Sequence, residues 1–332
     1  MPRRRRVPAG THVYFASDVH GSDLAWRKFL SAAAFYEADA LVFGGDLMGK
    51  QLVPIVEESG GYLARFNGED HAFERDGLQP FTEWLARTGT YWRVMERAEY
   101  EHMKDVPVAQ EELFQEVAAA RLRQWLERAE DKLAGTAIRL YLTGGNDDDP
   151  EVLELVEKHQ GEHVVPCEGR LVDLDGEHTM ITVGWSSPTP WNTWREASEG
   201  DLEAMIDGQA GAVADLGRCV FNLHCPPKDT PIDACVQLEV PADPESAELP
   251  AMVRTGGRYR MVGGGSSAVR EAVRRYQPVV GLHGHIHESP GRFRIGRTQC
   301  FNPGSEYGQG ILRGWMVNLR GGTLAGYQHT SG

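Results

Sequence analysis

The sequence has too little positive charge for a general nucleic-acid-binding protein. Its 332 residues include 34 Lys and Arg against 48 Asp and Glu, which gives a formal net charge of -14. Affinity for nucleic acids comes largely from Lys and Arg side chains that neutralise phosphates, so we expect no extended nucleic-acid surface. The sequence also lacks a run of about 18 apolar residues that could cross a bilayer, so no membrane partner is expected. A small or locally bound substrate fits this composition better.

Cysteine is scarce, and the cysteines form no recognisable pairs. The chain has 5 cysteines, scattered along it and without a CxxC motif. This usage fits reduced thiols in the cytoplasm better than a disulfide framework. The basic segment from Arg3 to Arg6 resembles the start of a signal peptide, but the chain turns polar before an adequate apolar segment forms. We therefore expect a cytoplasmic protein with a solvated basic tail.

The first 50 residues have the pattern of two βα units. An apolar alternation ends after Phe15 and predicts a buried strand that delivers Asp18 and His20 at its carboxyl end. A helix is expected from about Asp23 to Phe35, with Ser22 or Asp23 as its cap. The segment ADALVFGGDLMG then repeats the strand followed by glycine and aspartate. Two such units indicate an α/β sheet with a site at its strand ends.

From about residue 51 to 135 the composition changes to long charged stretches with apolar residues at helical spacing, such as EELFQEVAAARLRQWLERAEDKLAG. We expect a mostly helical insertion or cap on a single domain that spans 1–332. The segment IRLYLTGG resumes the strand pattern, and Asp148 or Asp149 before Pro150 predicts a helix to about Lys158. The second half is richer in predicted strands, with a short helix introduced by Ser266.

Polar residues with metal-binding chemistry follow the predicted strands. Each is weak evidence by itself, because an Asp after a strand is usually a turn former or a helix cap. In DVH and HIH, however, the two outer residues stand at i and i+2, so on an extended segment they point the same way, as two ligands of one metal pair require. The set comprises Asp18, His20, Asp46, Asn146, Asp147, Asp148, His224, His285 and His287.

These residues fall into five blocks: Asp18-Val-His20, Gly45-Asp46, Gly145-Asn146-Asp147-Asp148, His224, and Gly284-His285-Ile286-His287. Their order resembles the pattern DxH, GD, GN(H)(D/E), H and GHxH of the calcineurin-like metallophosphoesterases, from about residue 12 to 327. Segments such as SSPTPWNTWRE, NLHCPP and HGHIHES look like the small bacterial and archaeal Icc- or YfcE-like branch. The resemblance implies an α/β fold, a four-layer α/β/β/α sandwich of two mixed sheets with the site on strand-end loops at one edge.

The resemblance also implies a dinuclear metal centre in which Asp46 bridges. One ion would take Asp18, His20, Asp46 and His287, and the other Asp46, Asn146, His224 and His285. A bridging carboxylate lowers the repulsion between two divalent cations about 3.5 to 4 Å apart, and mixed nitrogen and oxygen ligands suit Mn, Fe, Zn or Ni, with Mn favoured here. Hydrolysis by a metal-activated hydroxide, which attacks phosphorus in line with the leaving oxygen, is the implied chemistry.

One position departs from the family pattern. The family commonly has His after the Asn of GN(H)(D/E), where it is thought to protonate the leaving oxygen or to hold the phosphate; here the residue is Asp147. A carboxylate near two cations stays ionised, so it is a poor acid and a poor anion clamp. A second interpretation is that Asp147 caps the following helix and faces away. Asn146 and Asp147 are the candidate catalytic residues.

Loss of that acid penalises poor leaving groups such as the alkoxides of monoesters, whereas a diester carries less negative charge and can present a better leaving group. We therefore predict hydrolysis of phosphodiesters of nucleotides, for example 2′,3′-cyclic ones, or of other small diesters. The alternatives are a phosphomonoesterase, including a protein phosphatase, and a non-catalytic scaffold. The amphipathic helices of 51–135 are expected to pack against the sandwich, and partner binding, shading of the site and homodimer formation are the alternatives.

Several other residues have both a functional and a structural interpretation. His283 is expected to be a hydrogen-bonded strand-end histidine, with contact to the metal ligands as the alternative. The glycines from Gly263 to Gly265 lack the lysine of a P-loop and are interpreted as a turn. Loop residues that could reach a substrate, or pack beneath their loops, are Ser187, Trp191, Trp194, Asn302 and Ser305.

Overall fold

Two six-stranded mixed sheets form the body of the molecule. The computed structural model describes residues 10–239 and 251–332, so the basic segment from Arg3 to Arg6 lies outside the described residues. The first sheet has the order β20 (Thr323–Ser331), β19 (Arg313–Arg320), β1 (Thr11–Ala16), β2 (Ala40–Phe43), β7 (Arg139–Leu142) and β8 (Val164–Pro166). The second has the order β17 (Gly291–Ile295), β18 (Thr298–Asn302), β16 (Val280–Leu282), β11 (Cys219–Leu223), β10 (Thr179–Val183) and β9 (Val172–Asp173).

Strand alternation packs these two sheets face to face. Side chains of one parity, such as Phe15 and Val42 in the first sheet and Val220 and Leu282 in the second, meet in a shared apolar core. The opposite parity, for example Tyr14 in β1, faces outward into a separate core with helices. Because successive side chains of a strand point to opposite faces, each strand serves both layers.

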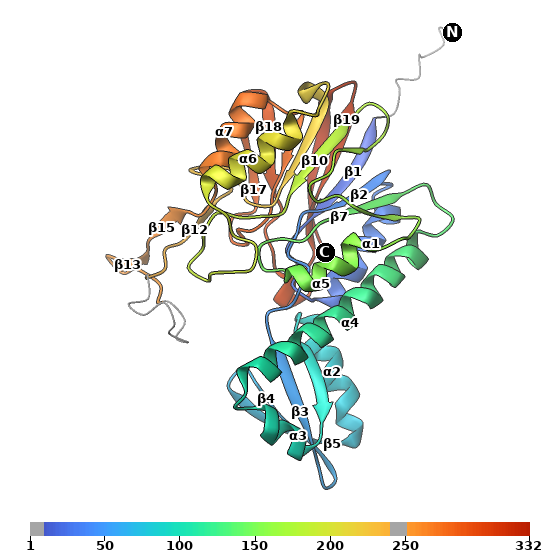
Figure 1. Cartoon of the computed structure of the whole chain (residues 1–332), viewed down its shortest axis with the longest axis vertical. Helices are drawn as coiled ribbons and strands as arrows, with labels where there is room; N and C mark the ends of the chain where they lie inside the picture. The colour runs from blue at the N-terminus through green and yellow to red at the C-terminus, as the bar shows by residue number, and fades with distance from the viewer. Residues whose placement is uncertain (1–9, 240–250) are drawn as a thin grey trace.

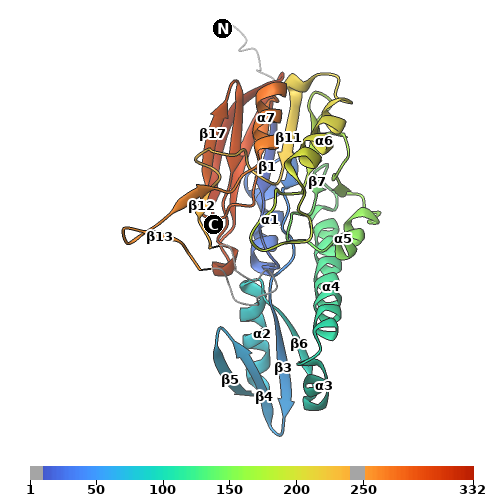
Figure 2. The ribbon, with the colours of Figure 1, turned by 60° about the vertical axis from the view of Figure 1, so that its left-hand side comes forward.

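Helices cover the two outer faces. Helices α1 (Asp23–Phe35), α4 (Pro107–Leu133) and α5 (Pro150–Glu157) share an apolar core with the first sheet. Helices α6 (Glu199–Ala210) and α7 (Ser267–Tyr276) do so with the second. Figures 1 and 2 show this order of helix, sheet, sheet and helix layers. The predicted α/β fold with two mixed sheets is therefore confirmed.

Several helices begin at the residues that the sequence indicates. Helix α1 has the predicted bounds, and the Ser22 hydroxyl accepts the backbone N–H of Ala25. The Asp149 carboxylate accepts from Glu151 at the start of α5, and the Ser266 hydroxyl accepts from Val269 at the start of α7. Such caps satisfy backbone donors that have no partner inside the helix. Helix α6, which begins at the cap Ser198, is absent from the sequence prediction.

The inserted segment contains a sheet of its own, so the expectation of a mostly helical insertion at 51–135 is incomplete and needs correction. Its elements are β3 (Leu52–Glu58), β4 (Gly61–Phe66), β5 (Glu69–Glu74), the 3-10 turn Arg75–Gly77, α2 (Leu78–Arg87), β6 (Tyr91–Met95) and α3 (Arg97–Met103). We call residues 52–103 the lobe; its four strands have the order β5, β4, β3, β6. Ile55, Phe66, Phe81 and Leu85 belong to a separate apolar core of the lobe.

Helix α4 joins the lobe to the body. Figure 1 shows it running from the lobe at the bottom of the view to the outer face of the first sheet. The indoles of Trp26 in α1 and Trp125 in α4 stack with ring centroids 4.8 Å apart and planes 6° from parallel. Trp125 Nε1 also donates to Asp23 Oδ1 at 3.1 Å. Both indoles are almost fully buried, so this pair fixes α4 on the body.

Two short pairs of antiparallel strands form an arm beside the second sheet (Figure 2). Strand β12 (Ala234–Val236) pairs with β15 (Met261–Gly263), and β13 (Arg254–Thr255) pairs with β14 (Arg258–Tyr259). The predicted strand ACVQLEV forms β12 in its first part, and its last residue, Val240, lies outside the described residues. Within the described part of the chain, no helix has the length and apolar character needed to span a membrane.

Candidate metal centre

The candidate ligands lie on loops at one edge of both sheets. Strands β1, β2 and β7 are parallel, as are β11 and β16, so their carboxyl ends bring the following loops together. Backbone hydrogen bonds tie these loops to one another: Asp18 N donates to the carbonyl of Gly45 at 2.9 Å, and Gly284 N donates to the carbonyl of His224 at 2.8 Å. All seven residues predicted as metal ligands follow these strands.

Four of them form one compact group. Asp18, His20, Asp46 and His287 each offer one ligand atom, and these four atoms lie within 4.8 Å of one another. His20 Nε2 lies 3.0 Å from His287 Nε2 and 3.5 Å from Asp46 Oδ2. Carboxylate oxygens and imidazole nitrogens at this spacing suit a divalent transition metal.

The other three gather around Asn146. Its Oδ1 lies 3.0 Å from His224 Nε2 and 2.7 Å from His285 Nδ1. His224 Nε2 is in turn 3.5 Å from Asp46 Oδ2, the same oxygen that lies 3.5 Å from His20 Nε2. Asp46 therefore stands between the two groups, in the position that the sequence predicts for the bridging ligand.

Contacts behind the ligands orient them toward the centre. His20 Nδ1 lies 3.3 Å from the carbonyl of Met48, and His224 Nδ1 lies 2.8 Å from the carbonyl of Gly44. A carbonyl can only accept, so in each ring Nδ1 is the donor and Nε2 is the nitrogen that faces the site. Such contacts are the usual support of metal-binding histidines, and the residues present therefore fit a pair of divalent ions.

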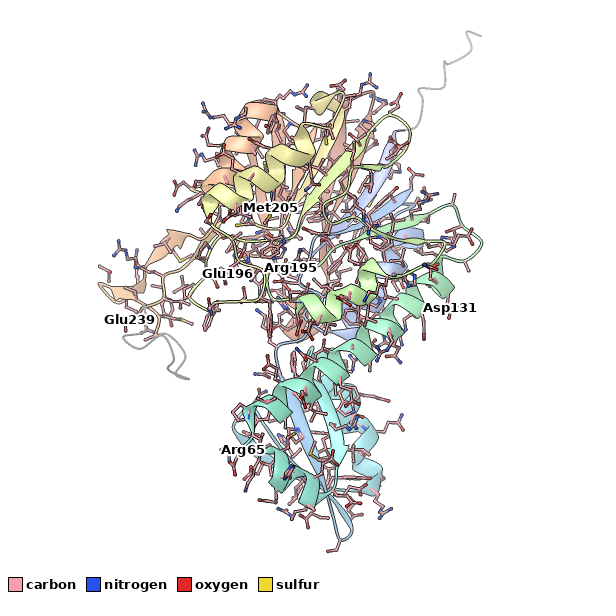
Figure 3. The ribbon with its side chains drawn as sticks, in the orientation of Figure 1. Arg65, Asp131, Arg195, Glu196, Met205 and Glu239 are labelled. Carbon is pink, nitrogen blue, oxygen red and sulfur yellow. The ribbon has the colours of Figure 1, made fainter. Side chains whose placement is uncertain are left out.

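The loop after β10 holds Asn146 in its orientation. Asn146 Nδ2 donates to Thr193 Oγ1 at 2.9 Å, which leaves Oδ1 facing the two histidines. Thr193 Oγ1 in turn donates to Glu196 Oε1 at 2.7 Å, and Arg195 Nη1 donates to the carbonyl of Gly145 at 3.1 Å. Arg195 and Glu196 lie near the centre of the molecule in Figure 3. Sequence reasoning missed Thr193, since a lone threonine carries no motif.

The backbone of the site is strained. Asp18, His20, Asp46 and His285 have φ angles of 58°, 38°, 58° and 68°. These values lie in the left-handed region, which side-chain-bearing residues adopt rarely and at a cost of roughly 1 to 3 kcal/mol each. Strain of this kind concentrates at functional sites, where the surrounding structure imposes it.

The buried charges of the site shift one another's pKa values. Burial alone would raise the pKa of Asp46, but His224, His20 and Lys50 hold it well below the ordinary value. Burial would lower the pKa of His224, but the Asp46 carboxylate raises it to about 9. Burial lowers the pKa of His285 to about 4, which keeps that imidazole neutral and able to bind a metal.

Asp147 faces the site, so the interpretation that it caps the following helix is wrong. The cap of α5 is Asp149. Asp148 is fully buried and accepts three backbone N–H groups, from Leu47, Met48 and Gly145. Asp147 itself donates its backbone N–H to Asp46 Oδ1 at 3.1 Å.

The Asp147 carboxylate is paired with a lysine that sequence reasoning did not identify. Asp147 Oδ2 lies 2.5 Å from Lys50 Nζ, and Asp147 Oδ1 accepts from Asn146 Nδ2 at 3.2 Å. Burial and the nearby Asp46 raise the pKa of Asp147 to about 6, and Lys50 opposes this rise. The residue expected to be a poor anion clamp thus stands beside a cation.

The remaining candidates support loops or face solvent. His283 Nδ1 lies 2.8 Å from the carbonyl of Leu223 in a fully buried position, as expected for a hydrogen-bonded strand-end histidine. Ser305 Oγ donates to the carbonyl of Asp18 at 2.6 Å, and Asn302 Nδ2 donates to the carbonyl of Ile286 at 2.9 Å. The glycines interpreted as a turn begin inside a strand, since Gly263 ends β15, and Gly265 N donates to Asp233 Oδ2 at 3.1 Å in the bend that follows.

The two loop tryptophans do not pack beneath their loop. Trp191 and Trp194 are each 51% exposed, and Ser187 Oγ contacts Cys225 Sγ at 3.9 Å.

Tyr307 is a further residue that carried no sequence signal. Its ring packs on that of His20, with centroids 4.7 Å apart, so it forms one wall of the site.

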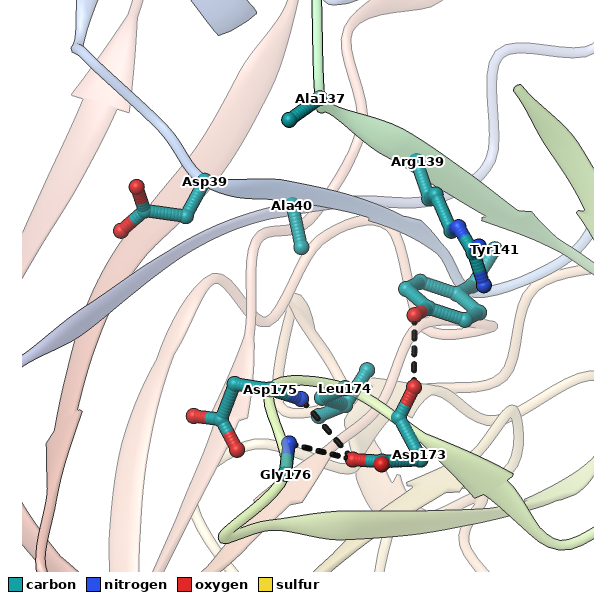
Figure 4. A pocket seen from close by; sticks show the side chains of 9 residues that line it. All are labelled: Asp39, Ala40, Ala137, Arg139, Tyr141, Asp173, Leu174, Asp175 and Gly176. Carbon is teal, nitrogen blue, oxygen red and sulfur yellow. Dashed lines mark hydrogen bonds between the residues drawn. The ribbon is translucent and has the colours of Figure 1, made fainter. Parts of the chain in front are cut away.

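A cavity of about 260 Å³ lies elsewhere (Figure 4). It is lined by residues at the amino ends of β2 and β7, including Ala40 and Arg139, together with Asp173 and Asp175. The candidate ligands follow the carboxyl ends of the same strands. This cavity is therefore separate from the metal centre.

Comparison with known proteins supports the fold. One solved crystal structure aligns over 97% of this chain and 98% of its own, with 14% identity and a TM-score of 0.57. The crystal structure of TT1561 from Thermus thermophilus aligns over 97% and 98%, with 13% identity and a TM-score of 0.49. A dimetal phosphatase from Danio rerio aligns over 97% and 98%, with 9% identity and a TM-score of 0.41. No protein-family model and no curated protein sequence matches the chain.

At these identities the likeness concerns the fold alone. The chain shares the fold of the structure with the TM-score of 0.57, and its two mixed sheets between helical layers agree with the fold that the sequence resemblance implies. Placement in the Icc- or YfcE-like branch stays a prediction.

Proposed function

We propose that this chain is a dinuclear metal-dependent phosphoesterase that hydrolyses phosphodiester bonds of nucleotides, for example 2′,3′-cyclic ones, or of other small diesters. The observation that carries the proposal is the position of Asp46, whose Oδ2 lies 3.5 Å from Nε2 of both His20 and His224. Seven ligand residues thus form two groups that share one carboxylate. Four backbone positions in these groups have left-handed φ angles, and strain of this kind is typical of functional sites, which argues against a scaffold that binds no metal.

This geometry supports a proposed assignment of the residues that would hold the metals. Asp18, His20 and His287 would hold one ion, Asn146, His224 and His285 would hold the other, and Asp46 would contribute to both. When bound, two divalent ions, with Mn favoured, would activate the attacking water and offset negative charge that develops on the phosphate. The protein's own contribution is to fix these ligands through the carbonyls of Met48 and Gly44.

Asp147 is the reason to favour diesters. The Asp147 carboxylate lies 2.5 Å from the Lys50 ammonium, so this oxygen is engaged by Lys50 and does not replace the histidine as a proton donor to a leaving alkoxide. Hydrolysis of a monoester depends more on such a proton than hydrolysis of a diester with a better leaving group. The composition and net charge of the chain are the basis on which we propose a small, nucleotide-like substrate and a cytoplasmic location.

A phosphomonoesterase is the second candidate, and Lys50 is the observation that favours it. A cation at the site would help to hold the extra negative charge of a monoester. Its pairing with Asp147 offsets much of that advantage, because the pair is neutral as a unit. If Asp147 offsets the charge of Lys50, the site favours a diester; if Lys50 keeps an effective positive charge, the site favours a monoester.

A hydrolysis screen separates the two candidates. The Mn-loaded protein and an Asp147→His variant would be assayed on 2′,3′-cyclic nucleotides, bis-p-nitrophenyl phosphate and p-nitrophenyl phosphate. We expect faster cleavage of the diesters by the wild-type protein and a gain in monoester cleavage in the variant. Faster cleavage of p-nitrophenyl phosphate than of its diester by the wild-type protein would overturn the diester preference.

A further inference from the structure

Lys50 lies at the mouth of the proposed metal centre. Its Nζ is 2.5 Å from Asp147 Oδ2, and that same oxygen lies 3.9 Å from Nδ1 of the ligand His20. The backbone N–H of Asp147 bonds to Asp46 Oδ1. Asp147 thus links the two charges: its side chain contacts the Lys50 ammonium, and its backbone N–H contacts the carboxylate of Asp46, which both ligand groups share.

The backbone around Lys50 is fixed. Gly49 N donates to the hydroxyl of Tyr91 at 2.9 Å, and Tyr91 N donates to the carbonyl of Gln51 at 2.9 Å. Tyr91 is almost fully buried at the start of β6. The backbone on both sides of Lys50 is therefore held by Tyr91 of the lobe, which fixes the point from which the lysine side chain reaches the site.

The Lys50 ammonium has donors to spare. An ammonium carries three N–H donors, and within the described residues Asp147 is the ion-pair partner that the structure shows for it. The side chain is 46% exposed, so part of it is open to a ligand beside the centre. The Lys50 ammonium is therefore positioned to contact an anion without rearrangement of the site.

We propose that Lys50 binds substrate: its ammonium contacts an anionic oxygen of the substrate phosphate, and Asp147 positions it by accepting one of its N–H bonds. This inference rests on the proposed function, and it names the residue that takes over phosphate contact where the usual histidine is replaced by Asp147. Because Asp147 balances the charge of Lys50, the pair suits a phosphate with one negative charge, which is a diester.

The experiment measures phosphate binding as well as turnover. Mn content and the Kd for inorganic phosphate, by calorimetry, would be compared among the Mn-loaded wild-type protein, Lys50→Met and Lys50→Arg. The matched control is Lys104→Met, just after α3, because Lys104 Nζ makes an ion pair of the same length, 2.5 Å to Glu101, on the surface of the lobe. Cleavage of bis-p-nitrophenyl phosphate would supply kcat and KM.

We expect Lys50→Met to keep the Mn content of the wild-type protein and to weaken phosphate binding roughly 10- to 100-fold, the range for loss of a hydrogen bond to a charged group. KM for the diester should rise more than kcat falls. Lys50→Arg should recover most of the phosphate affinity, and Lys104→Met should match the wild-type protein. The recovery by arginine distinguishes a contact from a folding defect.

Unchanged phosphate affinity in Lys50→Met would overturn the inference and leave the proposed function standing. So would a loss in Lys50→Arg as large as that in Lys50→Met, or no phosphate binding by the Mn-loaded wild-type protein. Failure of the wild-type protein to bind Mn would instead overturn the proposed function itself. The metal content therefore tells the two failures apart.

Discussion

Asp46 is the residue through which the two halves of the site interact. Its Oδ2 contacts imidazoles from both ligand groups, and its Oδ1 accepts the backbone N–H of Asp147. Its left-handed backbone follows Gly45, where a side chain would meet Gly145 Cα at 2.7 Å. The tight approach of these two loops is what places the carboxylate between the groups.

Asp46→Asn should therefore disable the centre. An amide is neutral and binds two cations poorly, so we expect fewer than two Mn ions per chain. Turnover should fall by more than about 100-fold, which is the upper range for loss of a residue that only supports a ligand. Metal analysis and diester hydrolysis check both expectations. Asp201→Asn on α6, remote from the ligands, is the control; two Mn ions in Asp46→Asn would contradict the bridging role.

Residues with a pattern could be predicted, and residues without one could not. The metal ligands stand at strand ends, and two pairs of them, in DVH and HIH, have i and i+2 spacing, which the sequence displays directly. The expectation that these two segments are extended is wrong, because Asp18, His20 and His285 have left-handed φ angles. Lys50 and Tyr307 reach the site from loops whose local sequence gives no sign of it. Among the three consecutive aspartates, pattern alone could not decide which one caps α5, because all three suit a cap and only their backbone geometry separates Asp149 from Asp147.

At the scale of elements, one carboxylate of α4 anchors the start of strand β8. Glu130 accepts the backbone N–H groups of Glu162, His163 and Val164, at 3.1, 2.9 and 2.9 Å. It also pairs with His159 at 2.9 Å. Burial alone would raise the pKa of Glu130, but His159 and the three backbone donors lower it.

Glu130→Ala should lower the free energy of unfolding by about 1 to 3 kcal/mol at neutral pH, because three backbone donors lose their acceptor. A lowered pKa means that the stabilisation is present above the ordinary value of 4.5 and is lost as the pH falls below it. Urea unfolding at pH 7 and near pH 4 should thus show a smaller difference at the lower pH. Glu127→Ala, an exposed residue of the same helix, should have little effect at either pH; a constant difference for Glu130→Ala would refute the account.

Elements with weak or conflicting patterns escaped prediction. Strand β3 contains Pro54, and the exposed strand β5 has the sequence EDHAFE, so neither shows the apolar alternation of a strand. Their strand conformation depends on pairing within the lobe. Helix α6 contains Gly200 and Gly208, which weaken its helical signal, and it is stabilised by packing of Leu202 and Ile206 on the second sheet.

At the scale of the whole molecule, the lobe contacts the site where the backbones of Gly21, Gly49 and Gly89 approach one another closely. A Cβ on Gly89 would clash with the carbonyl oxygen of His20, and one on Gly21 would lie 2.7 Å from the carbonyl oxygen of Gly89. A Cβ on Gly49 would clash with the carbonyl oxygen of Gly89 as well. The lobe therefore touches the loop of a metal ligand without an intervening side chain.

Gly89→Ala should weaken Mn binding and destabilise the protein, because the new methyl group would displace the loop that carries His20. The control is Gly68→Ala: its φ of 80° is close to the 82° of Gly89, it belongs to the same lobe, and a Cβ there meets nothing within 4 Å. Backbone strain alone should cost the control about 1 to 2 kcal/mol and leave Mn affinity unchanged. Equal Mn affinity in both variants would show that the contact has no effect on the site.

The central claim is that seven residues form two metal sites around Asp46. Anomalous diffraction at the Mn absorption edge from crystals of the Mn-loaded protein tests it directly. The account predicts two peaks that share Asp46, one also bound by Asp18, His20 and His287, and the other by Asn146, His224 and His285. A single peak, or peaks away from these residues, would contradict it.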